Sequence, residues 1–146
     1  MGRLNHRILW LAFVCATGFS AGAHTENLTG PVEARILRVL DGDTFEAEAR
    51  VWPGHSVRVN VRIRGIDAPE IKSRCGAERR AALEARAALS ELLGERVSLW
   101  NIGSAKYYGR VLADVETAEG TSVVPFMLSR GLARPYEGGR RAGWCG

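Results

Sequence analysis

The sequence predicts an α+β domain in which five short strands close into a small β-barrel and two helices pack against it. Three observations indicate this fold. Five short stretches have the apolar content or the alternation of half-buried strands. One long stretch rich in Ala, Leu and Glu has helical spacing. The elements follow the order of three strands, a helix, two strands and a short helix, which is typical of small closed barrels.

The first three expected strands precede the long helix. Residues 33–40 form an apolar-rich stretch that ends at the Asp-Gly-Asp-Thr sequence of residues 41–44, and residues 45–51 alternate after it. These stretches predict a hairpin with an acidic turn. The third strand, residues 57–63, shows the cleanest alternation of aliphatic and polar residues. A period of two places its four aliphatic side chains on a buried face and Arg62 on the other face.

The remaining elements follow in the second half of the chain. Residues 73–93 predict an amphipathic helix, because Ala and Leu recur at helical spacing before Gly94. We then expect strands over residues 96–102 and 110–116 and a helix over residues 123–128. Together the elements predict a five-stranded barrel of the OB type with packed helices.

The N-terminal residues 1–23 have the pattern of a signal peptide. Basic residues precede the apolar run 8–16, and small residues ending in Ala-Gly-Ala precede His24. The run is shorter than the roughly 20 apolar residues that a membrane helix needs. We therefore expect residues 24–146 to form a single secreted or periplasmic domain without a membrane segment. A retained N-terminal anchor is the alternative.

Cysteine content fits an exported domain, and the charge bears on possible partners. Removal of the leader takes Cys15 with it and leaves Cys75 and Cys145. Two cysteines can form one disulfide, which export favours. A metal pair or a catalytic thiol is the alternative, although the sequence has no Cys-x-x-Cys motif and His55 stands alone in its loop. The formal net charge of +4 permits a polyanionic partner without requiring one.

Carboxylates occur in two of the predicted loops. Asp43 lies in the hairpin turn, and Asp67 and Glu70 lie in the loop after the third strand. Oxygen ligands of this kind suit a hard cation, either Ca²⁺ or Mg²⁺. Arg62 and Arg110 each lie on or at the start of an expected strand, and their planar guanidinium groups match the geometry of a phosphate. Each motif is weak alone, but together they indicate a phosphodiester site.

These motifs, taken together, resemble the staphylococcal nuclease-like (thermonuclease) family. The shared pattern is a strand leading into the sequence of residues 41–44, then Arg62 five residues before the Asp-Ala-Pro-Glu of residues 67–70. A helix and a Lys-Tyr-Gly-Arg-type segment, here Lys-Tyr-Tyr-Gly-Arg in residues 106–110, complete it. The resemblance covers residues 32–136. An extra tyrosine in residues 106–110 is the main departure from the family pattern.

The resemblance implies a metal ion at the acidic loops. Its ligands would be Asp43, Asp67 and the backbone carbonyl of Ala68, and the ion would be Ca²⁺ rather than Mg²⁺. Glu70 would lie near the metal and would position or deprotonate the attacking water.

The same resemblance implies how the substrate is held. Arg62 and Arg110 would hold the scissile phosphate, because phosphodiester hydrolysis builds negative charge on the phosphate oxygens. Tyr107 or Tyr108, together with Tyr136, would stack on or hydrogen-bond the substrate. The extra tyrosine leaves open which of Tyr107 and Tyr108 faces the phosphate.

The expected protein is thus a monomeric, Ca²⁺-dependent nuclease acting on DNA, RNA or both. One alternative is an OB-type module that binds nucleic acid without cutting it. Another is a phosphodiesterase acting on a small nucleotide.

Overall fold

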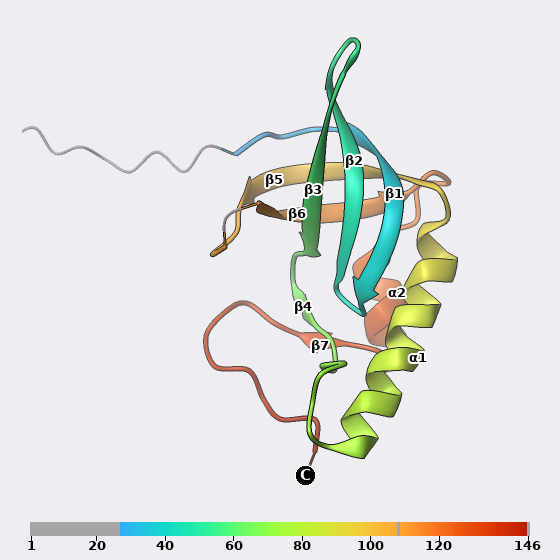
Figure 1. The fold of residues 1–146 in the computed structure, drawn as a ribbon, viewed down its shortest axis with the longest axis vertical. Coiled ribbons are helices and arrows are strands. Elements are labelled where there is room, and N and C mark those ends of the chain that lie inside the picture. Colours follow the sequence, from blue (N-terminus) through green and yellow to red (C-terminus); the bar gives the residue numbers. More distant parts are fainter. Residues whose placement is uncertain (1–26, 108, 146) are drawn as a thin grey trace, which may run out of the picture.

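The computed structural model describes residues 27–107 and 109–145, and it shows a closed five-stranded barrel with two helices (Figure 1). The barrel strands are β1 Val32–Asp41, β2 Thr44–Trp52, β3 His55–Ile63, β5 Arg96–Ser104 and β6 Arg110–Thr117. They are arranged in the order β1-β2-β3-β6-β5, and antiparallel pairing of β1 with β5 closes the barrel. The predicted fold is therefore confirmed. The expected leader, residues 1–23, and Tyr108 lie outside the described residues.

The β3–β6 pair is parallel, while the other neighbouring pairs in the barrel are antiparallel. Parallel strands need a long crossover connection, which α1 and β5 supply here. The pairing sets Arg110 opposite Asn60 and Leu112 opposite Arg62. As a result, the start of β6 lies beside the end of β3.

Two short strands were not predicted from the sequence. β4 Ile66–Asp67 pairs antiparallel with β7 Arg134–Pro135, and Tyr136 continues the contact by donating its backbone N–H to Gly65 O at 2.9 Å. Strands of two residues are too short to show an alternating pattern. Their pairing brings the C-terminal segment against the loop that follows β3.

The helices cover the barrel on one side (Figure 1). α1 Gly76–Leu93 packs on β1 and contacts α2 Val123–Ser129. Its buried residues are Ala82, Ala85, Leu89 and Leu93. α1 begins three residues after the expected start because the side chain of Ser73 bonds locally instead: Ser73 Oγ accepts the Cys75 N–H at 3.2 Å and donates to Glu78 at 2.6 Å.

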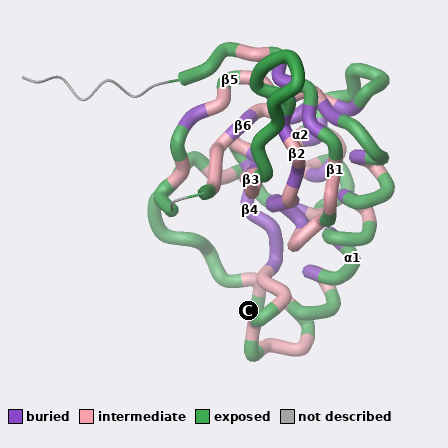
Figure 2. The backbone as a smooth tube through the Cα atoms, turned by 45° about the horizontal axis from the view of Figure 1, so that its top comes forward, coloured by how far each residue is buried: buried purple, intermediate pink, exposed green. Residues whose placement is uncertain are grey.

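The core fills the barrel interior, with Phe45, Val61 and Ile63 fully buried. By contrast, the tip of the β2–β3 hairpin projects beyond the barrel and is exposed (Figures 1 and 2). Trp52 is 70% exposed there, and Val57 is half exposed. The expectation that Val57 shares the buried face of β3 is therefore wrong, because alternation indicates a face but not where the barrel ends. No helix in the described ranges has the length and hydropathy needed to cross a membrane.

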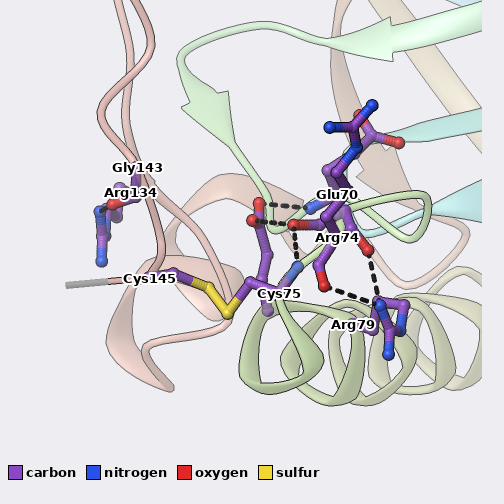
Figure 3. The surroundings of a disulfide bond; sticks show 9 residues. Glu70, Arg74, Cys75, Arg79, Arg134, Gly143 and Cys145 are labelled. Atoms are coloured by element: carbon purple, nitrogen blue, oxygen red, sulfur yellow. Dashed lines mark hydrogen bonds between the residues drawn. A yellow bond between two sulfur atoms is a disulfide. The ribbon is translucent and has the colours of Figure 1, made fainter.

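A disulfide joins Cys75, directly before α1, to Cys145 (Figure 3). The same C-terminal segment is also held by Arg134. The Arg134 guanidinium lies 3.8 Å from the centroid of the Trp144 ring and donates a hydrogen bond to Gly143 O at 2.8 Å. These contacts hold the end of the chain near the N-terminal end of α1.

Removing this disulfide should destabilise the fold. The bond closes a loop with a sequence separation of 70 residues, so the chain-entropy model predicts a loss of about 4 kcal/mol in the Cys75→Ala, Cys145→Ala double variant. Thermal unfolding measures the effect, and wild-type protein kept in reductant should show the same lowered midpoint. Equal midpoints for oxidised wild type and double variant would contradict the prediction.

Candidate functional site

The β1–β2 turn places Asp43 at the end of the barrel. The Asp41 carboxylate accepts the Asp43 N–H at 3.1 Å, and the Thr44 hydroxyl donates to Asp43 Oδ1 at 2.9 Å. Asp43 is only 2% exposed. Gly42 allows the turn to lie this deep, because a Cβ atom there would be 2.7 Å from the Cβ atoms of both Ala68 and Ala85.

Asp43 also ties this turn to the loop that carries the other carboxylates. Its Oδ2 atom accepts the Ala68 N–H at 2.8 Å, and its carbonyl accepts the Ile63 N–H at 2.9 Å. A carboxylate that is buried needs such partners to offset its lost hydration. The turn and the loop therefore form one rigid unit.

Arg62 lies between the carboxylates of this unit. Register pairs it with Thr44 on β2, and its guanidinium forms ion pairs with Asp43 and, at 3.5 Å, with Asp67. It also donates to Ile66 O at 3.1 Å. The side chain is 17% exposed. Loss of one partner from a buried ion pair leaves an uncompensated charge, so Arg62 has a structural role in addition to any role with substrate.

Negative charge accumulates in the β1–β2 turn. Burial, followed by the nearby charge of Asp43, raises the pKa of Asp41 to about 6. The turn thus concentrates carboxylates where their ionised forms disfavour one another. A bound cation would stabilise the ionised forms of these carboxylates.

The sequence analysis did not identify Arg141, which the C-terminal segment brings into the site. Its Nε donates to Asp67 Oδ1 at 2.5 Å and its Nη2 to Ala68 O at 2.9 Å, while Nη1 lies 3.6 Å from Glu70 Oε2. A signal was available in the sequence: Arg141 precedes Cys145 by four residues, and Cys75 follows Glu70 by five.

Arg110 reaches the site from the start of β6. β6 runs parallel to β3, and Arg110 lies opposite Asn60, two residues before Arg62. The Arg110 guanidinium lies 5.2 Å from the centroid of the Tyr107 ring. Tyr107 is 57% exposed. Tyr136 is half-buried and donates its hydroxyl hydrogen bond to Gly139 O at 2.8 Å.

These side chains line two cavities. The first, of about 220 Å³, is lined by Asp41, Asp43, Thr44, Arg62, Ala68, Pro69, Glu70, Tyr107, Arg110 and Arg141. The second, of about 460 Å³, is lined by Arg62, Ser104, Ala105, Lys106, Tyr107, Arg110, Leu112, Tyr136, Gly139 and Arg141. The predicted catalytic residues thus lie together in the first cavity, Asp67 is buried beside it, and Tyr136 lines the second.

A larger cavity, of about 610 Å³, lies elsewhere, between β5, β6 and the start of α2. Its charged groups already have partners within the protein. Arg64 pairs with Asp114 at 3.1 Å, and Trp100 donates its ring N–H to Glu116 at 3.1 Å. Its walls are mainly apolar. This cavity therefore offers less to a phosphodiester than the smaller one beside Arg62.

The donor atoms at the site suit a hard cation. Asp43, Asp67 and the carbonyl of Ala68 all present oxygen, and the Arg141 guanidinium already contacts both Asp67 and Ala68 O. Within residues 27–107 and 109–145, no three His, Cys, Asp or Glu side chains are arranged to hold a metal ion together. An ion that completes its shell with carbonyls and waters needs only one or two carboxylates. The residues present therefore fit such an ion.

Comparisons with known proteins place this chain beside a family of nucleases. The family described as staphylococcal nuclease homologue matches residues 60–142. Two relatives, each named as an uncharacterized endonuclease, from Escherichia coli and Escherichia coli O157:H7, are 33% identical to this chain over 110 residues. The aligned region covers 75% of this chain and 65% of each relative. The chain thus spans slightly under two thirds of the length of these relatives.

Substituting Gly42 with Ala should disturb the site. The added methyl group would lie 2.7 Å from Ala68 and Ala85, and such overpacking costs typically about 1–3 kcal/mol. Gly76→Ala is the matched control, because its Cβ would meet Arg80 and Arg79 at the ordinary distances of 3.6 and 3.8 Å. Urea unfolding should show a clear loss for the first variant and none for the second. Equal free energies of unfolding for the two variants would contradict the packing argument.

Proposed function

Because this chain belongs to the family of staphylococcal nuclease homologues, whose members generally depend on divalent metal ions, we propose that it is a nuclease that hydrolyses the phosphodiester bonds of DNA, RNA or both. One observation carries the proposal. A single cavity is lined by carboxylates and by arginines from separate elements, including Glu70, Arg62 and Arg110. Carboxylates for a cation and guanidiniums for a phosphate are the groups that this reaction requires.

The arginines supply charge where the reaction develops it. Attack on phosphorus increases negative charge on the phosphate oxygens, and a preorganised guanidinium stabilises that charge. Arg110 lies in the first cavity near Arg62, and the two are fixed relative to each other by the β3–β6 ladder. Arg62 is in turn oriented by Asp43 and Ile66 O. The backbone positions of both arginines are therefore set before the charge forms.

Glu70 is the proposed residue for the attacking water. Its backbone N–H donates to Glu78 at 3.0 Å, which fixes the main chain, while its carboxylate borders the cavity. A carboxylate in this position can orient a water molecule and accept its proton. Ca²⁺, when held by Asp43, Asp67 and the carbonyl of Ala68, would supply Lewis-acid stabilisation of a phosphate oxygen. We favour Ca²⁺ over Mg²⁺ because Ca²⁺ accepts backbone carbonyls and irregular geometry more readily.

The second cavity supports a nucleic-acid substrate. It adjoins the first, shares Tyr107 and the arginines Arg62, Arg110 and Arg141 with it, and adds Tyr136. Aromatic rings beside basic side chains are the groups on which single-stranded bases stack. Because the relatives are named as endonucleases, we propose cleavage at internal bonds.

We also propose that the protein is exported to the periplasm or secreted and acts there as a monomer. The leader-like composition of residues 1–23 supports export. The disulfide between Cys75 and Cys145 also supports export, since such bonds persist in oxidising compartments.

Mass spectrometry of the protein recovered outside the cytoplasm should give a chain that begins at His24. A chain that begins at Met1 would contradict removal of the leader.

Digestion of single-stranded DNA and RNA tests the proposed activity. With Ca²⁺, we expect cleavage that a chelator abolishes. Glu70→Gln should lower the rate by about 10²–10⁴-fold, and Arg110→Ala by about 10²–10³-fold. The controls are Glu91→Gln and Arg86→Ala, which change exposed residues of α1 and should cleave at the wild-type rate.

Two outcomes would contradict parts of the proposal. No cleavage by wild type with either Ca²⁺ or Mg²⁺ would leave a module that binds nucleic acid without cutting it. Full activity in Glu70→Gln would remove Glu70 from the catalytic assignment. Arg62→Ala is less informative, because it also strips Asp43 of a buried partner. Its thermal midpoint must therefore be measured beside its activity.

A further inference from the structure

The Arg141 guanidinium contacts oxygens of two of the three residues proposed to hold the metal. It contacts Asp67 Oδ1 at 2.5 Å and Ala68 O at 2.9 Å, and it lies 3.6 Å from Glu70 Oε2. Each of its three nitrogens faces a different one of these oxygens. A planar cation with its donors directed in this way satisfies the oxygens much as a metal ion would.

The C-terminal segment holds Arg141 in this place. Before Arg141, β7 pairs with β4, and Tyr136 bonds to Gly65. After it, Trp144 stacks on Arg134, and Cys145 is bonded to Cys75 (Figure 3). Because both ends of this short segment are attached, Arg141 stays at a high effective concentration beside the carboxylates.

We propose that Arg141 is an internal cation that competes with Ca²⁺ for the oxygens of Asp67 and Ala68. The inference rests on the metal site of the proposed function. Ca²⁺ binds oxygen at about 2.3–2.6 Å, so an ion on these oxygens would lie beside a guanidinium that is bonded to the same atoms. Two like charges this close repel strongly away from bulk water. Binding of Ca²⁺ therefore requires Arg141 to move away.

Arg141 is better suited than Arg62 to move. The Arg141 side chain is 44% exposed and comes from an irregular segment. The Arg62 side chain is far less exposed, belongs to a barrel strand and also bonds to Asp43 and Ile66 O. Arg141 lines the second cavity as well as the first. When displaced, its guanidinium therefore has a solvated position at the second cavity.

Calorimetric titration of the protein with Ca²⁺ alone, without nucleic acid, tests this competition. Arg141→Gln removes the competing cation and keeps a side chain of similar length. We expect its Ca²⁺ dissociation constant to fall about tenfold below that of wild type, the effect of losing a few charge-assisted hydrogen bonds. Arg140→Gln is the matched control, since Arg140 is the exposed neighbour in the same segment. Its dissociation constant should change by less than about twofold, because exposed charges are screened.

Three results would overturn the proposal. Equal dissociation constants in wild type and Arg141→Gln would show that Arg141 does not occupy the cation position. Equal tightening in both variants would show a general charge effect. No binding of Ca²⁺ by Arg141→Gln would show that these oxygens do not form a calcium site. Failure of the nuclease proposal is separate, because it would appear as absence of cleavage rather than as a change in Ca²⁺ affinity.

Discussion

The buried carboxylate of Asp43 is the interaction on which the site depends. It accepts hydrogen bonds from Thr44 and from the backbone of Ala68, and it pairs with Arg62. These bonds join the β1–β2 turn, the loop after β3 and the β3 strand itself. A carboxylate is costly to bury, and its partners are costly to leave unpaired. The fold can therefore keep Asp43 in place only by keeping this whole end of the barrel ordered.

The barrel also places a second arginine, Arg110, beside the end that Asp43 holds in order. Parallel pairing of β3 with β6 brings Arg110 close to Arg62 on the neighbouring strand, although the two are far apart in sequence. A closed barrel limits relative movement of its strands because no edge is free. The backbone positions of the two arginines are thus set by strand hydrogen bonds rather than by flexible loops. This rigidity suits a site that stabilises charge on a phosphate.

Charge balance at the site involves arginines with different freedom to move. The Arg62 side chain is mostly buried and belongs to strand β3. The Arg141 side chain is more exposed and belongs to the C-terminal segment, which the disulfide holds in place. Burial of Asp43 and Asp67, with Asp41 partly buried beside them, creates a demand for positive charge that these side chains meet. The metal ion proposed for this site would meet the same demand. The covalent link at Cys145 therefore bears on the chemistry of the site as well as on stability.

The sequence by itself determined the five barrel strands, the two helices and the face of β3 that carries Arg62, because these follow from local periodicity. Motif spacing also brought Asp43, Glu70 and Arg110 into one hypothesis, and the structure places them in one cavity. Only the tertiary structure decided the β4–β7 pairing, the exposed hairpin tip and the place of Arg141. Two-residue strands have no detectable period, and alternation does not show where a barrel ends. Arg141 reaches the carboxylates through a chain reversal and a disulfide that join segments distant in sequence, and no local pattern encodes such a contact.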